Sequence, residues 1–210
     1  SREFRRLAMK EFKHLPGLDL IRVFGILVVV FYHYQVETAV RGLCPADFLP
    51  AMEPLVQVAV YTMTLLSGSC LCWQEKSRSW SMKRYLWGRF LAIYPLFWLC
   101  FFPIFIYSDI ICGNNEGVAP WKLLLSIVGV DGYFQSFTPT FYKIGEWYLG
   151  CILFLYAVFP VLWRMIRRRG VVFAAVGALF AWLACCFVEN PGQLYPTLIG
   201  QLPLFFMGIF

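Results

Sequence analysis

An arginine and a histidine lie inside the first long apolar stretch of the chain, where ionisable side chains are costly and are often functional. Arg22 and His33 have ten residues between them in the segment GLDLIRVFGILVVVFYHYQ. In a helix, eleven steps of ~100° return almost to the starting azimuth, so both side chains would face one way, about 16 Å apart along the axis. Histidine accepts a proton near neutral pH, and Asp19 can pair with Arg22 across one turn. The pattern indicates a general base and a cation on one face of a membrane helix.

Each of these residues also has a structural explanation when it is taken alone. Arg22 could extend to lipid headgroups, and His33 could form a hydrogen bond between packed helices. Both on one stripe, with Gly25 between them to admit another helix or a ligand, favour function. We therefore predict that Asp19, Arg22 and His33 are catalytic.

Composition determines which elements carry these residues. Of 210 residues, 60% are hydrophobic and 14% are charged, against roughly 45–50% and about 25% in soluble domains. Apolar runs near the ~20 residues needed to cross a bilayer recur along the chain. We predict an all-α fold, a polytopic bundle of transmembrane helices with the lipid bilayer as solvent. The net charge of +6 is clustered beside the apolar runs, which indicates membrane topology and argues against nucleic-acid binding.

The apolar runs predict about six spans, near residues 18–38, 55–73, 86–107, 145–163, 171–188 and 196–210. Basic clusters before the first span and after the second place the N-terminus in the cytoplasm. Segment 121–137 is interrupted by Gly129, Asp131 and Gly132. If it crossed, the arginines after Trp163 would lie outside, so we predict a re-entrant or interfacial segment. The last run stops at Phe210 without a polar flank, and we expect a single membrane domain, 1–210, that is C-terminally truncated.

The eight cysteines show no Cys-x-x-Cys pair, and the chain has two histidines. We therefore expect most cysteines to be small buried residues and expect no metal site. Cys44 and Cys112 fall in loops predicted to lie outside the cytoplasm, where they could form a disulfide in an oxidising compartment.

Several short motifs follow one another along the chain. They combine a charged first span with small, aromatic and proline positions in later spans: Leu18, Asp19, Arg22 and His33; Leu66, Ser67 and Gly68; Arg84, Arg89, Tyr94 and Pro95; Trp147, Tyr148, Leu149, Tyr156 and Pro160; Phe205, Phe206 and Gly208. In this order, and with this spacing from arginine to histidine, the set resembles the acyltransferase-3 family of membrane O-acyltransferases, which decorate bacterial surface glycans and related molecules.

Two positions depart from the family pattern. Ala92 stands where the family often has a second arginine before the proline of the third span, which leaves Arg89 as the matching residue. Ile152 and Leu153 stand where the peptidoglycan and lipopolysaccharide branches commonly have paired glutamates. The resemblance therefore does not select the substrates of those branches.

The resemblance implies a domain of about ten spans in the cell membrane and the transfer of an acyl group to a hydroxyl. The donor would be acetyl-CoA or another acyl-CoA from the cytoplasm, and the acceptor a glycan or lipid-linked sugar; no bound cofactor is expected, and an oligomer is possible. His33 would be the general base or part of an acyl-enzyme relay. Arg22 would stabilise the donor phosphates or the oxyanion, and Asp19 would fix its rotamer.

Four further residues are candidates for binding. Arg84 and Arg89 could hold the phosphates of the acyl-CoA, because guanidinium groups suit phosphate oxygens. They could equally orient the span or contact lipid headgroups. Glu146 and Trp147 could bind a sugar. Alternatively, Glu146 is a charge favoured at a helix N-terminus, and Trp147 belongs to an interfacial aromatic belt.

Two other classes of protein fit part of the pattern. A transporter or channel would use Arg22, His33 and Glu146 in an ion or proton path. A non-catalytic membrane anchor for a soluble partner would use none of them for chemistry. Four more spans beyond Phe210 would favour the enzyme, and a soluble extension would favour the anchor.

Overall fold

The computed structural model describes residues 16–43, 45, 48–76, 81–113, 117–134, 137–144, 146–186 and 198–209. Secondary structure in these ranges is helical, without a strand, which confirms the predicted all-α fold. The chain divides into two compact units. One contains α2, α3, the end of α6 from Val171 and nearly all of α8; the other contains the elements between, up to Gly170 of α6.

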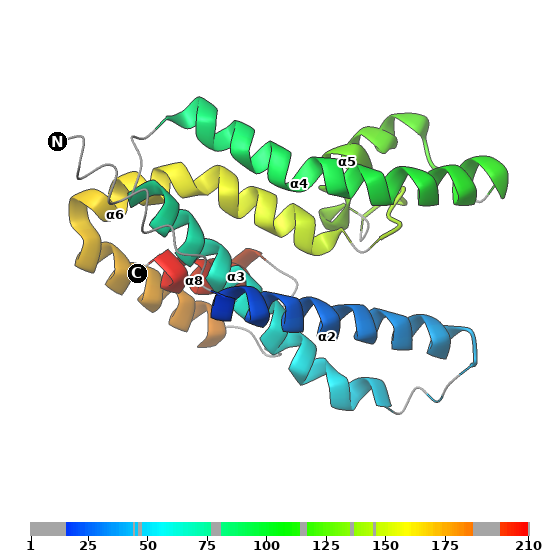
Figure 1. The fold of residues 1–210 in the computed structure, drawn as a ribbon, viewed down its shortest axis with the longest axis horizontal. Coiled ribbons are helices and arrows are strands. Elements are labelled where there is room, and N and C mark those ends of the chain that lie inside the picture. The colour runs from blue at the N-terminus through cyan, green and yellow to red at the C-terminus, as the bar shows by residue number, and fades with distance from the viewer. Residues whose placement is uncertain are drawn as a thin grey trace. The chain divides into compact units, whose positions relative to one another are not determined.

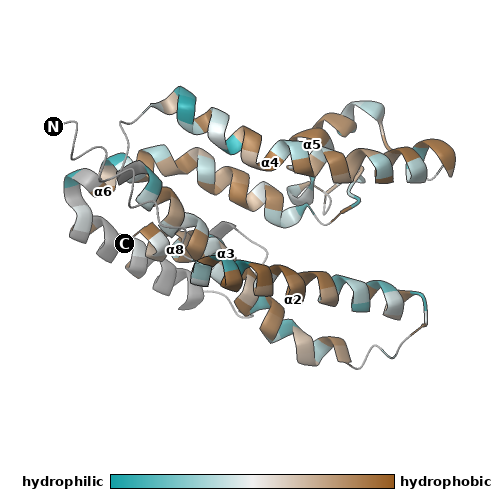
Figure 2. Ribbon diagram, viewed as in Figure 1, coloured by the Kyte–Doolittle hydropathy of each residue, from teal (hydrophilic) through white to brown (hydrophobic). Residues whose placement is uncertain are grey.

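Four of the described helices are long and apolar enough to cross a membrane: Pro16–Val40, Leu49–Gln74, Met82–Ile111 and Trp147–Ile166. They coincide with the first four predicted spans. Figure 2 shows hydrophobic residues along much of α2 and α4. In Pro16–Val40 only 11% of the apolar window is buried within the described chain, so most of its apolar side chains face outward, as expected of a helix that crosses a bilayer.

The first unit is built around α2 (Pro16–Val40) and α3 (Leu49–Lys76), which pack side by side in opposite directions (Figure 1). α2 begins with a proline, whose missing N–H is tolerated there. Val28 packs against Val56 and Ala59. Gly25 faces Met63 and Ala59 of α3, so the small residue between Arg22 and His33 admits a neighbouring helix.

A close crossing joins α3 to α8 (Leu198–Ile209) within the same unit. A Cβ at Gly68 would overlap the carbonyl oxygen of Phe205, and one at Gly208 would overlap that of Leu65. The buried Thr64 hydroxyl donates a 2.7 Å hydrogen bond to Gln201 Oε1 beside this crossing. Two motifs far apart in sequence, Ser-Gly and Phe-Phe-x-Gly, are thus the two sides of one contact of the small-residue type used between membrane helices.

The second unit contains α4 (Met82–Phe105), its π-helical continuation η2 (Ile106–Ile111) and the first part of α6 (Trp147–Cys186). Its aromatic core is formed by Phe97, Phe101 and Phe141. Three short elements lie between these helices: η3 (Pro120–Lys122), α5 (Leu123–Val128) and η4 (Asp131–Tyr133).

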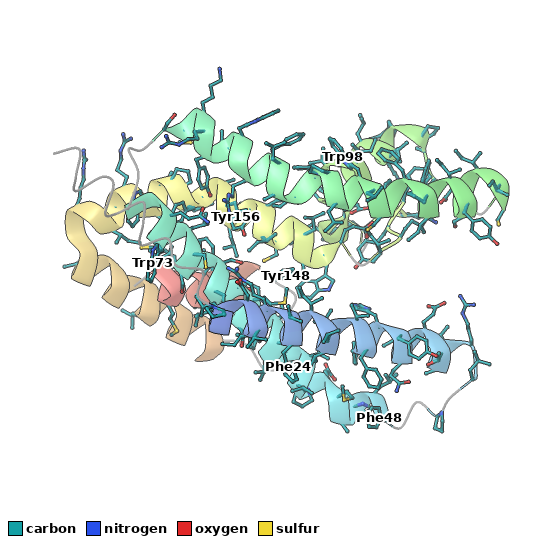
Figure 3. All side chains as sticks on the ribbon, in the orientation of Figure 1. Phe24, Phe48, Trp73, Trp98, Tyr148 and Tyr156 are labelled. Atoms are coloured by element: carbon teal, nitrogen blue, oxygen red, sulfur yellow. The ribbon has the colours of Figure 1, made fainter. Side chains whose placement is uncertain are left out.

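Side chains of α4 bind the end of α5. Trp98, labelled on α4 in Figure 3, donates from Nε1 to the Ile127 carbonyl at 2.9 Å. The Tyr94 hydroxyl donates to the Val128 carbonyl at 3.0 Å. These donors satisfy carbonyls that a helix terminus leaves open. The short, interrupted elements are compatible with a re-entrant or interfacial segment at 121–137, which stays a prediction.

Helix α6 covers the two predicted spans at 145–163 and 171–188, which stay predictions, and the two compact units divide within it, between Gly170 and Val171. The described chain is continuously helical from Trp147 to Cys186. Arginine is a good helix former, and a single internal Gly170 costs only about 1 kcal/mol relative to alanine, so nothing local breaks the helix between the two apolar stretches. Residues 187–188 of the fifth predicted span and 196–197 and Phe210 of the sixth lie outside the described residues, as does Cys44 of the predicted disulfide.

The crossing of α3 with α8 gives a test of the fold. Gly68→Ala or Gly208→Ala should destabilise the protein by about 1–3 kcal/mol, because the added methyl group forces two backbones apart. The measurement is the midpoint of thermal unfolding in detergent, followed by size-exclusion chromatography.

Gly88→Ala is the matched control, because Gly88 is also helical but has open space around its Cα. It should leave the midpoint unchanged or raise it slightly. Equal midpoints for Gly68→Ala and the control would contradict the close crossing.

Candidate functional site

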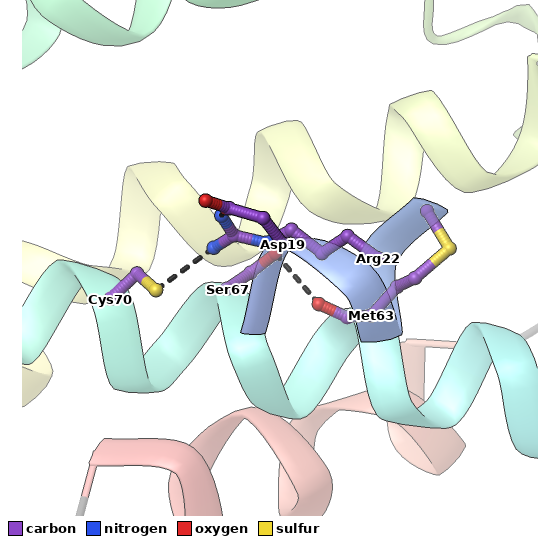
Figure 4. Close-up of polar contacts among 5 residues, drawn as sticks. All are labelled: Asp19, Arg22, Met63, Ser67 and Cys70. Carbon is purple, nitrogen blue, oxygen red and sulfur yellow. Dashed lines mark hydrogen bonds and ion pairs between the residues drawn. The ribbon is translucent and has the colours of Figure 1, made fainter. Parts of the chain in front are cut away.

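Arg22 is held by two side chains in the first unit. Its guanidinium donates to Cys70 Sγ at 2.8 Å and to Asp19 Oδ1 at 3.4 Å (Figure 4). The pair with Asp19 expected from their spacing therefore forms, and its length and partial exposure make it a weak interaction. The guanidinium is directed along α3 while part of it stays accessible. It can accept an anionic ligand in this position.

The sequence did not identify Cys70 as a partner of Arg22. A cysteine in an apolar segment is usually a small buried side chain, and only the packing of α2 on α3 places its sulfur opposite the arginine. The neighbouring Ser67 hydroxyl instead donates to the Met63 carbonyl within α3. Cys70 thus supplies the polar contact from the second helix.

His33 lies on the exposed side of α2, with its ring edge-on to that of Tyr32 at 6.0 Å. Because α2 is continuous from Pro16 to Val40, Arg22 and His33 share a face, about 16 Å apart along the axis. They are therefore not in contact. One small group cannot touch both, whereas an extended ligand can.

Arg89 and Arg84 occupy different environments in the second unit. The Arg89 guanidinium lies over the Tyr156 ring, 5.6 Å from its centroid, and lines a cavity of about 140 Å³. The Tyr85 hydroxyl donates to the Tyr156 carbonyl at 2.8 Å beside it. Arg84 is exposed and does not line this cavity, because five steps of ~100° turn it by roughly 140° from Arg89.

Glu146 is buried at the start of α6, where only 2% of its surface is exposed. Its carboxylate accepts hydrogen bonds from the backbone amides of Lys143 and Ile144 at 3.2 and 3.3 Å. Its own carbonyl accepts from Gly150 and begins the helix. Trp147, next in sequence, is half-buried and meets the Tyr148 ring at 5.7 Å.

Asp131 lies close to Glu146 and was not among the predicted site residues. It is fully buried, and neither carboxylate oxygen has a hydrogen bond of normal geometry within the described chain. Burial raises the pKa of Asp131, and the nearby Ser126 hydroxyl and local backbone amides oppose this only in part. The pKa of Glu146 is raised mainly by burial and, to a smaller extent, by repulsion from Asp131. The two carboxyl groups thus favour protonation.

A buried ion pair lies in the same unit. Lys143 Nζ contacts Asp109 Oδ2 at 3.1 Å and the Ser108 hydroxyl at 3.4 Å. Asp109 sits in the π-helical turn η2, an irregularity often found at functional sites. The sequence signal for these residues is a charge in or beside an apolar segment. At Asp131 this charge indicated only the topology of the segment. Asp109 and Lys143 were not predicted as site residues.

Within the described ranges, no three metal-ligating side chains gather into a possible site. The polar groups described above are the Arg22 guanidinium with a thiol and a carboxylate, the exposed His33 imidazole, the Arg89 guanidinium, and the buried charged groups near the start of α6. Together with the long apolar helices, these features define a helical membrane protein with ionisable groups on its helix faces.

Comparison with known proteins identifies the family. The acyltransferase domain of the acyltransferase-3 family matches residues 15–210. Acyltransferase MdmB from Streptomyces mycarofaciens is 26% identical over 191 residues, covering 84% of this chain and 47% of that protein. The chain thus spans about half the length of the curated relative it matches. No solved structure matches it significantly. The chain belongs to the acyltransferase-3 family, as its ordered motifs indicated.

The raised pKa values of Asp131 and Glu146 predict how stability changes with pH. When folding raises the pKa of an acid, its contribution to the free energy of unfolding is greatest below the pKa of the unfolded chain, about 4. That contribution is lost as the pH rises toward the pKa of the folded protein. Asp131→Asn removes one of these charges. It should therefore raise the unfolding midpoint at pH 7.5, with a smaller gain at pH 5.

Glu37→Gln is the control, because Glu37 is an exposed carboxylate paired with Arg41. It should change the midpoint little at either pH. A midpoint for Asp131→Asn that falls by the same amount at pH 5 and pH 7.5 would contradict the predicted charge burial.

Proposed function

We propose that the protein is a membrane O-acyltransferase that moves an acyl group, with acetyl as the first candidate, from cytoplasmic acyl-CoA to a hydroxyl of a glycan or lipid-linked sugar. The family match over residues 15–210 carries this proposal. The name of the relative MdmB, an acyltransferase, agrees with it. The placement of an arginine and a histidine on one face of α2 supplies residues for the chemistry.

In the proposed reaction, His33 removes the proton of the acceptor hydroxyl. The hydroxyl oxygen attacks the thioester carbonyl, and the resulting tetrahedral intermediate breaks its C–S bond. The CoA thiolate leaves and takes the proton from His33, so no net charge is gained or lost. An acyl-enzyme relay through His33 is the alternative, in which the imidazole carries the acyl group between the two partners.

Arg22 would bind an anionic part of the donor or the developing oxyanion. The separation of about 16 Å from His33 favours the first role, because CoA is an extended molecule with its diphosphate far from its thioester. Asp19 and Cys70 would hold the guanidinium in place. In this arrangement the donor lies along α2 from the cytoplasmic side.

The acceptor would approach near the start of α6. Trp147 is half-buried and could present a ring face to a sugar. The buried Glu146 is engaged with backbone amides, so its contribution would be to hold the turn that presents Trp147. Arg89 would assist donor binding from the cytoplasmic side; Arg84, exposed on another face, would contact donor phosphates more weakly.

Acetyl transfer by the full-length parent protein tests the proposal. His33→Ala should lower transfer from labelled acetyl-CoA in membranes by about 10²–10⁴-fold, the usual effect of a general base. Arg22→Ala should also lose most activity. Arg41→Ala, in the turn that follows α2, is the control and should keep full activity, because Arg41 is exposed and pairs with Glu37.

Full transfer by His33→Ala at matched expression would contradict the catalytic assignment. Absence of transfer by the wild type with any acyl-CoA, accompanied by solute flux into vesicles, would replace the enzyme with the transporter.

Cys70 provides a finer test of how Arg22 is positioned. Cys70→Ala removes the acceptor from α3 and should raise the KM for acetyl-CoA by about five- to tenfold, with a smaller effect on kcat. Cys70→Ser retains an acceptor and should recover most of the loss. Cys100→Ala, at an exposed cysteine of α4, should behave as wild type; equal kinetics for Cys70→Ala and Cys100→Ala would remove this role from Cys70.

A further inference from the structure

A cavity lies between the start of α4 and the middle of α6, within the second unit. Its volume is about 590 Å³, which falls within the roughly 300–1,000 Å³ of small-molecule sites. Its lining includes Met82 from α4 and, from α6, Pro160, Val161, Arg164, Met165 and Arg168. We call it the α4–α6 cavity. The proposed chemistry uses none of these residues.

Both walls of the α4–α6 cavity come from the ends of apolar helices. The candidate span of α4 begins at Met82, and that of α6 ends at Ile166. Tyr85, near the start of α4, stacks on Phe159 of α6 with the ring centroids 5.6 Å apart. Because the beginning of one span meets the end of the other, the cavity lies at a single surface of the bilayer. It is therefore at the depth of the lipid headgroups.

Two arginines give the α4–α6 cavity a basic edge. Arg164 and Arg168 are one helical turn apart on the same face of α6, and both are exposed. Neither forms an ion pair within the described part of the chain. They belong to a run of four arginines in residues 164–169, which the positive-inside rule assigns to the cytoplasmic side. The cavity thus offers two accessible cations to an anion.

The rest of the lining is mainly apolar and faces outward. Met82, Val161 and Met165 are all exposed, although they lie at the ends of helices suited to cross a bilayer. Methionine side chains adapt their shape to irregular apolar partners. The cavity therefore combines an edge that can bind a phosphate with a surface that can bind an acyl chain. A soluble phosphate compound would use only the first of these.

We propose that the α4–α6 cavity binds an anionic phospholipid of the cytoplasmic leaflet, with its phosphate on Arg164 and Arg168 and the first part of an acyl chain on Met82, Val161 and Met165. Guanidinium groups bind phosphate oxygens by charge-assisted hydrogen bonds. Basic pockets between membrane helices on the cytoplasmic side bind lipid headgroups in this way. The lipid is retained and not consumed, so its binding does not depend on the proposed acyl transfer.

Net charge selects among phospholipids at this site. Phosphatidylglycerol carries a negative phosphodiester and no cation. Phosphatidylcholine carries the same phosphodiester together with a quaternary ammonium group, which two nearby arginines repel. The α4–α6 cavity should therefore prefer phosphatidylglycerol, and the preference should weaken as the salt concentration rises.

Lipid binding to the full-length protein, stripped of lipid in a neutral detergent, tests the proposal. Native mass spectrometry measures the affinities for phosphatidylglycerol and phosphatidylcholine. The wild type should bind its first phosphatidylglycerol about tenfold or more tightly than phosphatidylcholine. Arg164→Gln combined with Arg168→Gln should weaken phosphatidylglycerol by about the same factor and remove the preference, with little change for phosphatidylcholine.

Single substitutions provide a matched control. Arg168→Gln and Arg41→Gln each remove one exposed positive charge, but Arg41 lies in the turn after α2 and does not line the cavity. Arg168→Gln should weaken phosphatidylglycerol by about threefold, and Arg41→Gln should leave it unchanged. Arg164→Lys with Arg168→Lys keeps the charge and should recover part of the preference, because lysine binds phosphate as a point charge.

Two soluble competitors distinguish a lipid from a soluble phosphate compound. Glycerophosphoglycerol, which is the phosphatidylglycerol headgroup without acyl chains, and CoA should both fail to displace phosphatidylglycerol from the wild type. Displacement by either would assign the arginines to a soluble ligand and overturn the lipid site. Equal wild-type affinities for the two lipids, or an unchanged preference in the Gln pair, would overturn it as well. None of these results bears on acyl transfer, so the lipid site can fail while the enzyme assignment stands.

Discussion

The absence of water in the bilayer core constrains this protein more than any single contact. A backbone that crosses lipid must satisfy its own N–H and C=O groups, and among spanning segments that requires helices or closed barrels. The four long apolar helices meet this requirement internally. Where the chain is not a long helix, between η2 and α6, its open carbonyls are bound instead by α4: Trp98 and Tyr94 donate to the end of α5. Irregular backbone is accepted there because neighbouring side chains complete it.

The same constraint explains how polar side chains are arranged. Arg22 faces a thiol and a carboxylate, Thr64 faces Gln201, and Lys143 faces Asp109. Burying such groups unpaired would cost several kcal/mol. Asp131 departs from this rule, and its raised pKa is the consequence. Burial disfavours the charged form of the carboxyl group, which is why the pKa of Asp131 rises.

The proposed chemistry divides between two helix faces. On α2, a base and a cation are set apart by about three turns, which suits an extended donor better than a compact transition state. On α6, Tyr156 lines a cavity together with Arg89 of α4, and Trp147 stands at the start of the helix.

The apolar runs alone predicted the all-α fold and the positions of the four long helices, because their length and hydropathy are local properties. The pairing of Asp19 with Arg22 and the shared face of Arg22 and His33 also followed from helical periodicity. The Ser-Gly and Phe-Phe-x-Gly motifs can be read in the sequence, but only the packing of the helices shows that Gly68 and Gly208 form one contact. The roles of Cys70 and Asp131 were likewise decided by tertiary structure. Their roles depend on which side chain of another element lies opposite, and no spacing within a single segment encodes that distance.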